Sequence, residues 1–218
     1  LIDMTGGTTK VTMYLDALCD VNKAYTEYDE FPDTASFSEE SLKLLRLLVK
    51  MGGLSQVNYW PENDDSYIRG RWFSEGKGRA LIGYTEIMSV MGENAENFIF
   101  RTFSYNKEEN IPLFFGDLAG INSKISEEKK EAAYDLLEIL TCAETMESAI
   151  LPGKSGETPQ YLLPARMSVY EELGKTLPVY EKLGEIAANP ENRLFKMGAD
   201  VREYLAAVKK VLPGLIFE

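Results

Sequence analysis

Hydrophobic residues along the chain recur mostly at the three- and four-residue spacing of amphipathic helices. Residues 8–25 keep their apolar positions on one face, which predicts a helix there. A second helix is predicted after Ser36, because Glu39 stands at capping-box spacing from it and Gly52 follows the last apolar position. A short helix that ends at Gly76 comes next. Helices therefore dominate the first part of the chain.

Three short runs have the composition of buried strands. The run at 79–84 is apolar and is bounded by Gly78 and by a helix-capping Thr85, and the other two runs are 98–103 and 113–121. Because strands are few and helices many, we expect an α/β chain with a helical C-terminal third. Three strands are too few for a complete open sheet in each of two domains, so part of the structure is expected to be missing.

The C-terminal third is predicted to be helical. A long amphipathic helix follows Ser126, and we expect its apolar stripe to be buried; the stripe consists of Ala133, Leu136, Leu137 and Leu140. From Glu144 onward, prolines interrupt the helical pattern. The last helix is predicted over 201–212, with Pro213 at its end.

The charge balance narrows the range of partners. Acidic residues outnumber basic ones by 35 to 23, which gives a formal net charge of −12. This surplus repels the phosphates of nucleic acids and of anionic lipid surfaces, so neither is an expected partner. The longest apolar run is far shorter than the roughly 18 to 20 residues of a membrane-spanning helix, so no membrane span is expected. The charge instead favours solubility and tolerates a cationic small molecule.

The chain contains no histidine. A Ser-His-Asp or Cys-His relay and a His-ligated metal site are therefore excluded, and a general base must be a carboxylate, a tyrosine or a lysine. We expect no cofactor and no metal. The two cysteines, Cys19 and Cys142, fall in helical patterns and are interpreted as small buried apolar residues.

The middle of the chain has a distinctive order of motifs. A Gly-Lys-Gly turn at 76–78 leads into a small and apolar strand at 80–83, and a later strand ends in Gly-Ile-Asn at 120–122 before the long helix. This order resembles the latter half of a type 2 periplasmic (solute-binding) protein. The resemblance implies two lobes with a ligand-binding cleft between them. It also implies that runs 79–84 and 113–121 do not pair in one continuous sheet.

The resemblance also suggests how the chain is divided. We expect residues 1–92 to form most of the second lobe, residues 93–103 to cross between the lobes, and residues 104–218 to return to the first lobe and end in the C-terminal helices. The N-terminal part of this fold is expected to be missing. Strand ends and helix N-termini at such a cleft direct backbone N–H groups toward a ligand.

Three segments narrow the resemblance further. Residues 82–86 read Ile-Gly-Tyr-Thr-Glu, residues 114–122 form an aspartate-bearing strand, and residues 159–166 with 168–170 form a C-terminal signature. In this order the segments resemble those of the bacterial type I thiaminases (thiamine pyridinylases). The resemblance implies a transferase in which a cysteine thiolate displaces the thiazole of thiamine, and an external amine or thiol then takes the pyrimidine.

The resemblance implies roles for five residues. Glu86 is the implied acid/base that activates the nucleophile, and a partly desolvated glutamate suits that role. Asp117 is implied to hold the aminopyrimidine and to offset the charge of the thiazolium. Tyr84, Tyr67 and Phe115 are implied aromatic walls, although the family commonly has an aromatic alcohol where this chain has Phe115.

These residues also have plainer interpretations. A carboxylate in the first turn of a helix, such as Glu86, stabilises the helix dipole. Tyr67 and Tyr84 could be core aromatics. Asp117 is harder to explain without a role, because an unpaired charge in an apolar strand is costly unless it faces a ligand, a partner or solvent.

The resemblance covers roughly the last three-fifths of such an enzyme. The family's nucleophilic cysteine lies upstream of every matched segment, and neither Cys19 nor Cys142 occupies its place. We therefore expect the C-terminal portion of a thiaminase-like transferase, whose partner is the missing N-terminal part of the same fold. The start at Leu1 rather than methionine favours a piece of a longer chain.

Two further expectations concern location and an alternative role. The resemblance implies an exported protein, extracellular or periplasmic, whose surface anchor would lie in a segment not present here. The alternative function is a non-catalytic solute-binding protein that feeds a transporter. Its ligand would be thiamine, a pyrimidine precursor, a sugar or another small molecule.

Overall fold

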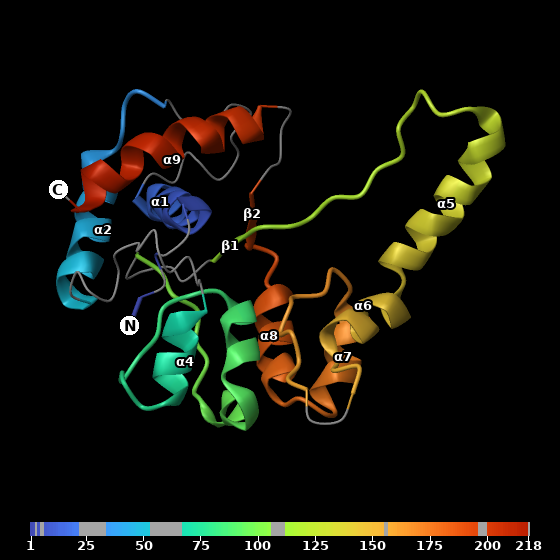
Figure 1. Ribbon diagram of the computed structural model, residues 1–218, viewed down its shortest axis with the longest axis horizontal. Helices are drawn as coiled ribbons and strands as arrows, with labels where there is room; N and C mark the ends of the chain where they lie inside the picture. The colour runs from blue at the N-terminus through green and yellow to red at the C-terminus, as the bar shows by residue number, and fades with distance from the viewer. Residues whose placement is uncertain are drawn as a thin grey trace.

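The computed structural model describes residues 1–2, 4, 7–21, 34–52, 67–105, 112–154, 157–195 and 200–217 of the chain (Figure 1). The α-helices in these ranges are α1 (Gly7–Val21), α2 (Glu39–Gly52), α4 (Ile68–Ser74), α5 (Glu127–Thr141), α6 (Ala143–Ile150), α7 (Met167–Gly174), α8 (Val179–Ala187) and α9 (Val201–Phe217). The 3₁₀ helices are η2 (Thr85–Val90) and η3 (Gly92–Asn97), and the strands are β1 (Leu113–Phe114) and β2 (Arg193–Leu194).

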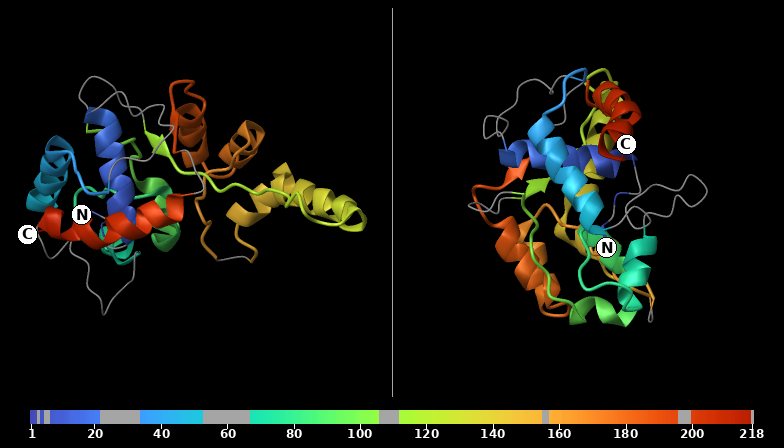
Figure 2. Two further views of the ribbon diagram at one scale, coloured as in Figure 1. Left: turned by 90° about the horizontal axis from the view of Figure 1, so that it is seen from above. Right: turned by 90° about the vertical axis from the view of Figure 1, so that its left-hand side faces the viewer.

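The first hydrophobic core joins the N-terminal and C-terminal helices. Helix α1 packs against α2 and α9, and α2 also contacts α9, so three amphipathic faces meet (Figure 2). The fully buried side chains of this core include Val11, Leu15, Leu45, Val208 and Leu212. The predicted cap of the second helix is wrong by two residues, because Ser38 rather than Ser36 accepts from the Ser41 amide, at 3.2 Å.

Helix α9 runs through Pro213 and ends at Phe217, so the predicted end at Pro213 is wrong. Leu212 and Ile216 flank the proline and are both buried in the first core. This packing holds the last turn in place despite the missing backbone donor of the proline. Nε of Arg46 also donates to the Leu215 carbonyl at 2.8 Å, which satisfies one of the free carbonyls of the helix end. None of the described helices is long and apolar enough to cross a membrane.

The second core lies around η2, η3 and helices α6 to α8. Helices α7 and α8 pack closely against each other, and α4 contacts both 3₁₀ helices. The buried side chains include Ile87, Met91, Tyr161, Leu173 and Tyr180. The Tyr180 hydroxyl donates to the Leu162 carbonyl at 2.8 Å, so this aromatic core residue has a partner for its polar end. This core fixes η2, which starts directly after Tyr84.

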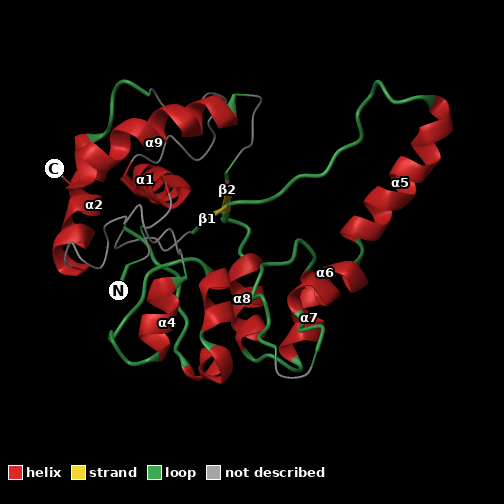
Figure 3. Ribbon diagram, in the orientation of Figure 1, coloured by secondary structure: helices red, strands yellow, loops and turns green. Residues whose placement is uncertain are grey.

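A short parallel sheet lies between the two groups of helices (Figure 3). Leu113 of β1 pairs with Arg193 of β2, and Phe114 pairs with Leu194. The Phe195 amide extends the ladder by donating to the Phe114 carbonyl at 2.8 Å. The sheet therefore joins a segment near the middle of the chain to one near its end.

The three predicted strands form only in part. In the run 79–84, Ile82 makes an isolated parallel bridge, the run 98–103 has no regular structure, and only the first two residues of the run 113–121 form a strand. A strand needs a neighbour for its backbone donors and acceptors, and few of these positions have one among the described residues. The described part is therefore mainly helical, and the α/β class stays a prediction. The runs 79–84 and 113–121 do not pair with each other, as expected.

Helix α5 extends away from both cores. An extended segment leads from β1 out to this helix (Figures 1 and 2). No residue of α5 is buried, and Leu136 and Leu140 are 56% and 52% exposed. The helix forms where it was predicted, but the predicted burial of its apolar stripe is wrong, because no other described segment covers that face fully.

The two hydrophobic cores are not divided from each other at residues 92 and 103, the predicted boundaries of the lobes. The first core combines residues between 2 and 49 with residues between 195 and 216, and the second combines residues between 87 and 95 with residues between 150 and 183. Each core thus draws on segments that are distant in the sequence. The assignment of residues 1–92, 93–103 and 104–218 to two lobes and a crossing stays a prediction.

The contact between α4 and η2 depends on Gly70. A Cβ atom at this position would lie 2.8 Å from Cγ1 of Ile87 and 2.9 Å from the Ile87 carbonyl oxygen. We expect Gly70→Ala to push η2 away and to lower the free energy of unfolding by about 1–3 kcal/mol, the usual cost of overpacking. Urea denaturation measures this loss. Gly120→Ala is the matched control, since a Cβ there meets nothing within 4 Å; an equal loss in both variants would contradict the prediction.

Candidate functional site

Glu86 lies in the first turn of η2, and its side chain is exposed. The turn is fixed by the Tyr84 carbonyl, which accepts from the Ile87 amide at 3.1 Å, and by the burial of Ile87 and Met88 in the second core. The Ser89 hydroxyl also donates to the Glu86 carbonyl, at 2.7 Å. The backbone of Glu86 is therefore held in place, whereas its carboxylate faces solvent. The partial desolvation expected of an acid/base is not provided by the described residues.

Tyr84 is anchored at its hydroxyl end. It precedes η2 in extended conformation, and its side chain is 37% exposed. Its hydroxyl forms a hydrogen bond with Oγ1 of Thr12 on α1. The Thr12 hydroxyl itself donates to the Thr9 carbonyl at 2.9 Å, so in this pair Tyr84 is the donor. The ring is thus fixed at one end, and part of its surface is open to a ligand.

Phe115 and Asp117 follow β1 on the extended segment that leads to α5. Phe115 packs against Phe195 with ring centroids 4.9 Å apart, and 37% of its surface is exposed. Asp117 is exposed, as is its neighbour Leu118. Because Asp117 faces solvent, its charge carries no burial cost in the described structure. Asp117 is assigned to the candidate site because it follows β1, and not because it is buried.

Tyr67 lies at the start of α4 and is half-buried against the second core. Phe73 of the same helix packs against Phe98 at a centroid distance of 4.6 Å. This environment favours the plainer interpretation of Tyr67 as a core aromatic. The five predicted residues therefore lie on three segments: the start of η2, the segment after β1 and the start of α4.

Helix α1 connects two of these segments. Thr12 contacts Tyr84 before η2. Eight residues later, the carboxylate of Asp20 accepts from the Ser104 hydroxyl at 3.0 Å and forms an ion pair with Arg193 of β2, the strand that pairs with β1. Both positions lie along one face of the helix. The structure therefore brings the η2 and β1 segments to the same face of α1.

This polar face was not predicted from the sequence. Asp20 forms a buried ion pair with Arg193 of β2, with a distance of 3.3 Å between Nη1 and Oδ1. Burial, and then the charge of Asp20, raises the pKa of Asp16 to about 7. The spacing of Thr12, Asp16 and Asp20 in a helix with buried apolar faces was the available signal, because buried carboxylates need partners.

Neither cysteine has the environment of a nucleophile. Cys19 is buried in α1, and burial raises its pKa to about 12, so its thiol stays protonated at neutral pH. Cys142 lies between α5 and α6, where its Sγ is 3.2 Å from the Ile139 carbonyl oxygen and 3.3 Å from Oγ1 of Thr145. Among the residues that the structure covers, no group of three or more acidic, cysteine or histidine side chains could hold a metal ion.

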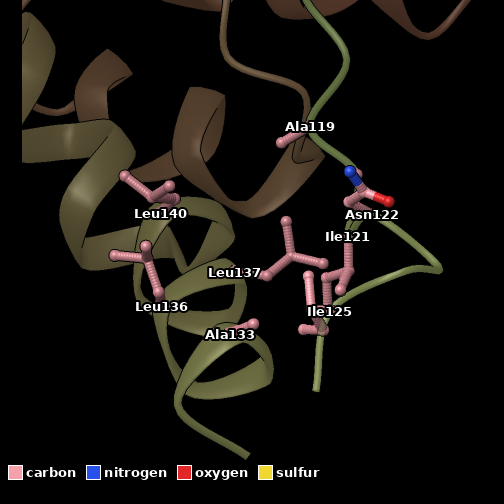
Figure 4. A pocket seen from close by; sticks show the side chains of 9 residues that line it. Ala119, Ile121, Asn122, Ile125, Ala133, Leu136, Leu137 and Leu140 are labelled. Carbon is pink, nitrogen blue, oxygen red and sulfur yellow. The ribbon is translucent and has the colours of Figure 1, made fainter. Parts of the chain in front are cut away.

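Two cavities of about 210 Å³ each lie elsewhere. The first is an apolar hollow between α5 and the segment before it (Figure 4), lined by residues that include Ile121, Ile125, Ala133, Leu137 and Leu140. The second is more polar and is lined by residues that include Thr102, Pro112, Lys182, Glu185 and Asn192. None of the five predicted site residues lines either cavity. Neither of these two cavities therefore lies at the predicted site.

Comparisons with known proteins agree on one family. Residues 1–106 match the model of the Thiaminase-1 domain. Over 213 residues the chain is 45% identical to thiaminase-1 of Paenibacillus thiaminolyticus, and the alignment covers 98% of this chain and 52% of that protein. The chain thus spans about half the length of the curated relative that it matches.

Two solved structures give the same result. The fold matches that of Clostridium botulinum thiaminase I in complex with thiamin, with a TM-score of 0.91 and 49% identity over 100% of this chain and 60% of that one. It also matches thiaminase I from Bacillus thiaminolyticus, with a TM-score of 0.89 and 44% identity over 99% of this chain and 59% of that one. The likeness to thiaminase I predicted from three sequence segments is confirmed. Over nearly all of its own length, the chain is therefore similar in sequence and fold to just over half of thiaminase I.

Proposed function

We propose that this chain contributes a large part of the thiamine site of a thiaminase-like transferase, which displaces the thiazole of thiamine with an external nucleophile. The observation that carries the proposal is the likeness in sequence and fold to a thiaminase I structure in complex with thiamin. The site would lie between the start of η2 and the segment after β1, in a cleft between two lobes. The lobes would be those expected from residues 1–92 and 104–218.

Two aromatic rings are suited to bind the planar substrate. Tyr84 and Phe115 each keep part of their surface exposed, while Thr12 anchors the first ring and Phe195 supports the second. Rings that are already ordered lose little conformational entropy when a ligand stacks on them. In our proposal they bind the pyrimidine by stacking and the thiazolium by cation–π contact.

Two exposed carboxylates would supply the polar chemistry. Glu86 would be the acid/base that activates the nucleophile, since its backbone is fixed by η2 while its carboxylate is free to reach a ligand. Asp117 would accept from the aminopyrimidine and offset the positive charge of the thiazolium. Desolvation of Glu86 would come from the ligand and from the part of the fold that this chain does not span. Tyr67 would have at most a distant role, behind the site.

The nucleophile would come from outside these 218 residues. The protonated thiol of Cys19 and the position of Cys142 at the end of α5 support this view. The partner would be the part of the thiaminase fold that this chain does not cover. The exposed apolar face of α5 supports such a partner, because Leu136 and Leu140 gain free energy only when another surface removes them from water. We also propose that the protein is exported.

A second candidate is a solute-binding protein for thiamine or a related small molecule, without catalysis. The buried, protonated thiol of Cys19 favours it for this chain taken alone. The two functions share the same aromatic walls and the same Asp117. They differ in the need for Glu86, which a binding protein for a cation would not require as a proton carrier.

The first prediction concerns the need for a second part. We expect the 218-residue chain alone to release no thiazole from thiamine in the presence of an added amine. A fusion to the portion of the Paenibacillus relative that this chain does not cover should release it. Chromatographic detection of free thiazole measures both. Cleavage by the chain alone would contradict the proposal, and binding without cleavage by the fusion would favour the solute-binding candidate.

The second prediction concerns proton transfer. In the active fusion, Glu86→Gln should lower kcat by about 10²–10⁴-fold with little change in KM, because it removes a proton carrier but keeps the shape of the side chain. The matched control is Glu93→Gln, which changes an exposed glutamate in the first turn of η3 and should leave kcat within about twofold. Equal activities for the two variants would show that Glu86 has no catalytic role.

The third prediction concerns substrate charge. Asp117→Asn should raise the dissociation constant of thiamine about 10- to 100-fold, because it removes the ionised acceptor that faces a cationic ligand. The matched control is Asp135→Asn on the exposed surface of α5, which has the same change in charge. Isothermal titration calorimetry at fixed salt measures both constants. A similar increase in the dissociation constant for both variants would show that Asp117 acts only through the net charge of the protein.

A further inference from the structure

A buried ion pair links α1 to the start of β2. The side chains of Asp20 and Arg193 are 2% and 7% exposed, and Nη1 of Arg193 lies 3.3 Å from Oδ1 of Asp20. Burying such a pair removes two charges from water, so apolar side chains of similar size often give equal or greater stability. The pair therefore calls for an explanation besides stability, and its location in the fold supplies one.

The described part of the sheet is too short to fix its own register. β1 and β2 pair over two residues each, and the Phe195 amide adds a hydrogen bond to the Phe114 carbonyl at 2.8 Å. Isolated two-stranded pairings are marginal in water. A slip of one residue would exchange the two faces of β2, because neighbouring side chains of a strand point to opposite sides. A contact outside the two strands must therefore specify which residues face α1.

The side chains along β2 alternate between the core and solvent. Arg193 and Phe195 are buried, whereas Leu194 between them is 60% exposed. Asp20 holds Arg193 on the buried side. After a slip of one residue, the carboxylate of Asp20 would be buried without its cation, which is costly. The ion pair thus selects a single register.

The same carboxylate also fixes the segment that precedes β1. Oδ2 of Asp20 accepts from the Ser104 hydroxyl at 3.0 Å and from the Tyr105 amide at 2.7 Å. Both of these residues come shortly before β1 in the sequence. Asp20 therefore holds β2 through an ion pair and the approach to β1 through two charge-assisted hydrogen bonds.

The register of β2 determines where the proposed ligand contacts lie after β1. Phe115 packs against Phe195, with ring centroids 4.9 Å apart, so its ring follows the position of β2. Asp117 comes two residues later on the same extended segment. A shift of β2 would therefore move both Phe115 and Asp117.

The other side of the proposed site is attached to the same helix. Tyr84 is held by the hydroxyl of Thr12 on α1. Thr12 and Asp20 are eight residues apart on this helix, which corresponds to a rise of about 12 Å. One helix therefore carries a contact to each side of the site, and it sets the spacing between them.

We propose that Asp20 and Arg193 are positioning residues for the proposed ligand site. Their ion pair holds β2 in one register on α1, and β2 then sets the position of Phe115 and Asp117 relative to Tyr84. Both residues act through others, since they are themselves buried. The inference rests on the proposed function only for the identity of the ligand, thiamine.

A double variant separates this role from a contribution to stability. Asp20→Asn with Arg193→Met removes both charges, so no unpaired charge remains, and the melting temperature of the fusion protein should change little. The dissociation constant for thiamine should still rise about tenfold, because the correct register falls to about a tenth of the population. Thermal melting and isothermal titration calorimetry measure the two quantities. A dissociation constant within about twofold of the unmodified value would overturn the proposal.

Three further variants serve as controls. Arg193→Lys keeps the cation and should bind thiamine within about threefold of the unmodified sequence, whereas Arg193→Met alone should lose about tenfold. Leu212→Ala removes a buried side chain from the first core, so it should lower the melting temperature but keep the affinity. Glu172→Gln with Lys175→Met removes an exposed ion pair and should alter neither quantity. An equal loss of affinity in Leu212→Ala and the double variant would overturn the proposal, because affinity would then follow stability alone.

Hydrogen exchange gives a second test that needs no ligand. In the 218-residue chain, the Phe195 amide of the double variant should exchange about tenfold faster or more, because its bond to the Phe114 carbonyl opens when the register is lost. The amide of Val208 in α9 should keep its protection. Equal acceleration at both amides, or none at Phe195, would overturn the proposal. If the double variant does not fold, Asp20→Asn alone is measured in the same way, since it keeps an acceptor for the Tyr105 amide.

The two tests also separate this proposal from the proposed function. Failure of the unmodified fusion to bind thiamine would refute the proposed function. The exchange rate of the Phe195 amide would still decide the role of the ion pair, because it is measured without a ligand.

Discussion

A buried ion pair between Asp20 and Arg193 joins α1 to β2. Nη1 of Arg193 lies 3.3 Å from Oδ1 of Asp20, and the other carboxylate oxygen accepts from the Ser104 hydroxyl at 3.0 Å and from the Tyr105 amide at 2.7 Å. One carboxylate thus holds a helix, a loop and a strand, and β2 in turn holds β1. Removing either charge would leave the other buried and unpaired, which costs about 3–5 kcal/mol. The placement of the proposed site depends on this ion pair. The start of η2 is attached to α1, and the segment after β1 is attached to β2 through the short sheet.

Local sequence patterns predicted much of the helical structure. The apolar period gave the positions of α1, α2, α5 and α9 to within a few residues, because a helix is determined mainly by neighbours in sequence. The segment at 82–86 also placed Tyr84 and Glu86 together at the start of one element, since adjacent residues remain adjacent in any fold. The likeness to thiaminase I could be predicted because it depends on residue identity rather than on packing.

Other features depend on distant contacts and were not predictable. The strand run at 113–121 has only two paired residues, because pairing needs a neighbour that local composition does not reveal. The stripe on α5 was predicted to be buried, but burial requires a covering surface that the described residues supply only in part. The role of Asp20 appears only when β2 is brought beside α1. Pattern alone locates such carboxylates without showing what they contact.

The proposed ligand site lies between the start of η2 and the segment after β1. The most direct test is a titration of the isotopically labelled chain with thiamine, followed by ¹H–¹⁵N correlation spectra. We expect saturable shifts of the backbone amides of Tyr84, Glu86 and Asp117, with little change along α5. Shifts confined to the apolar hollow beside α5, or equal shifts across the whole acidic surface, would contradict it.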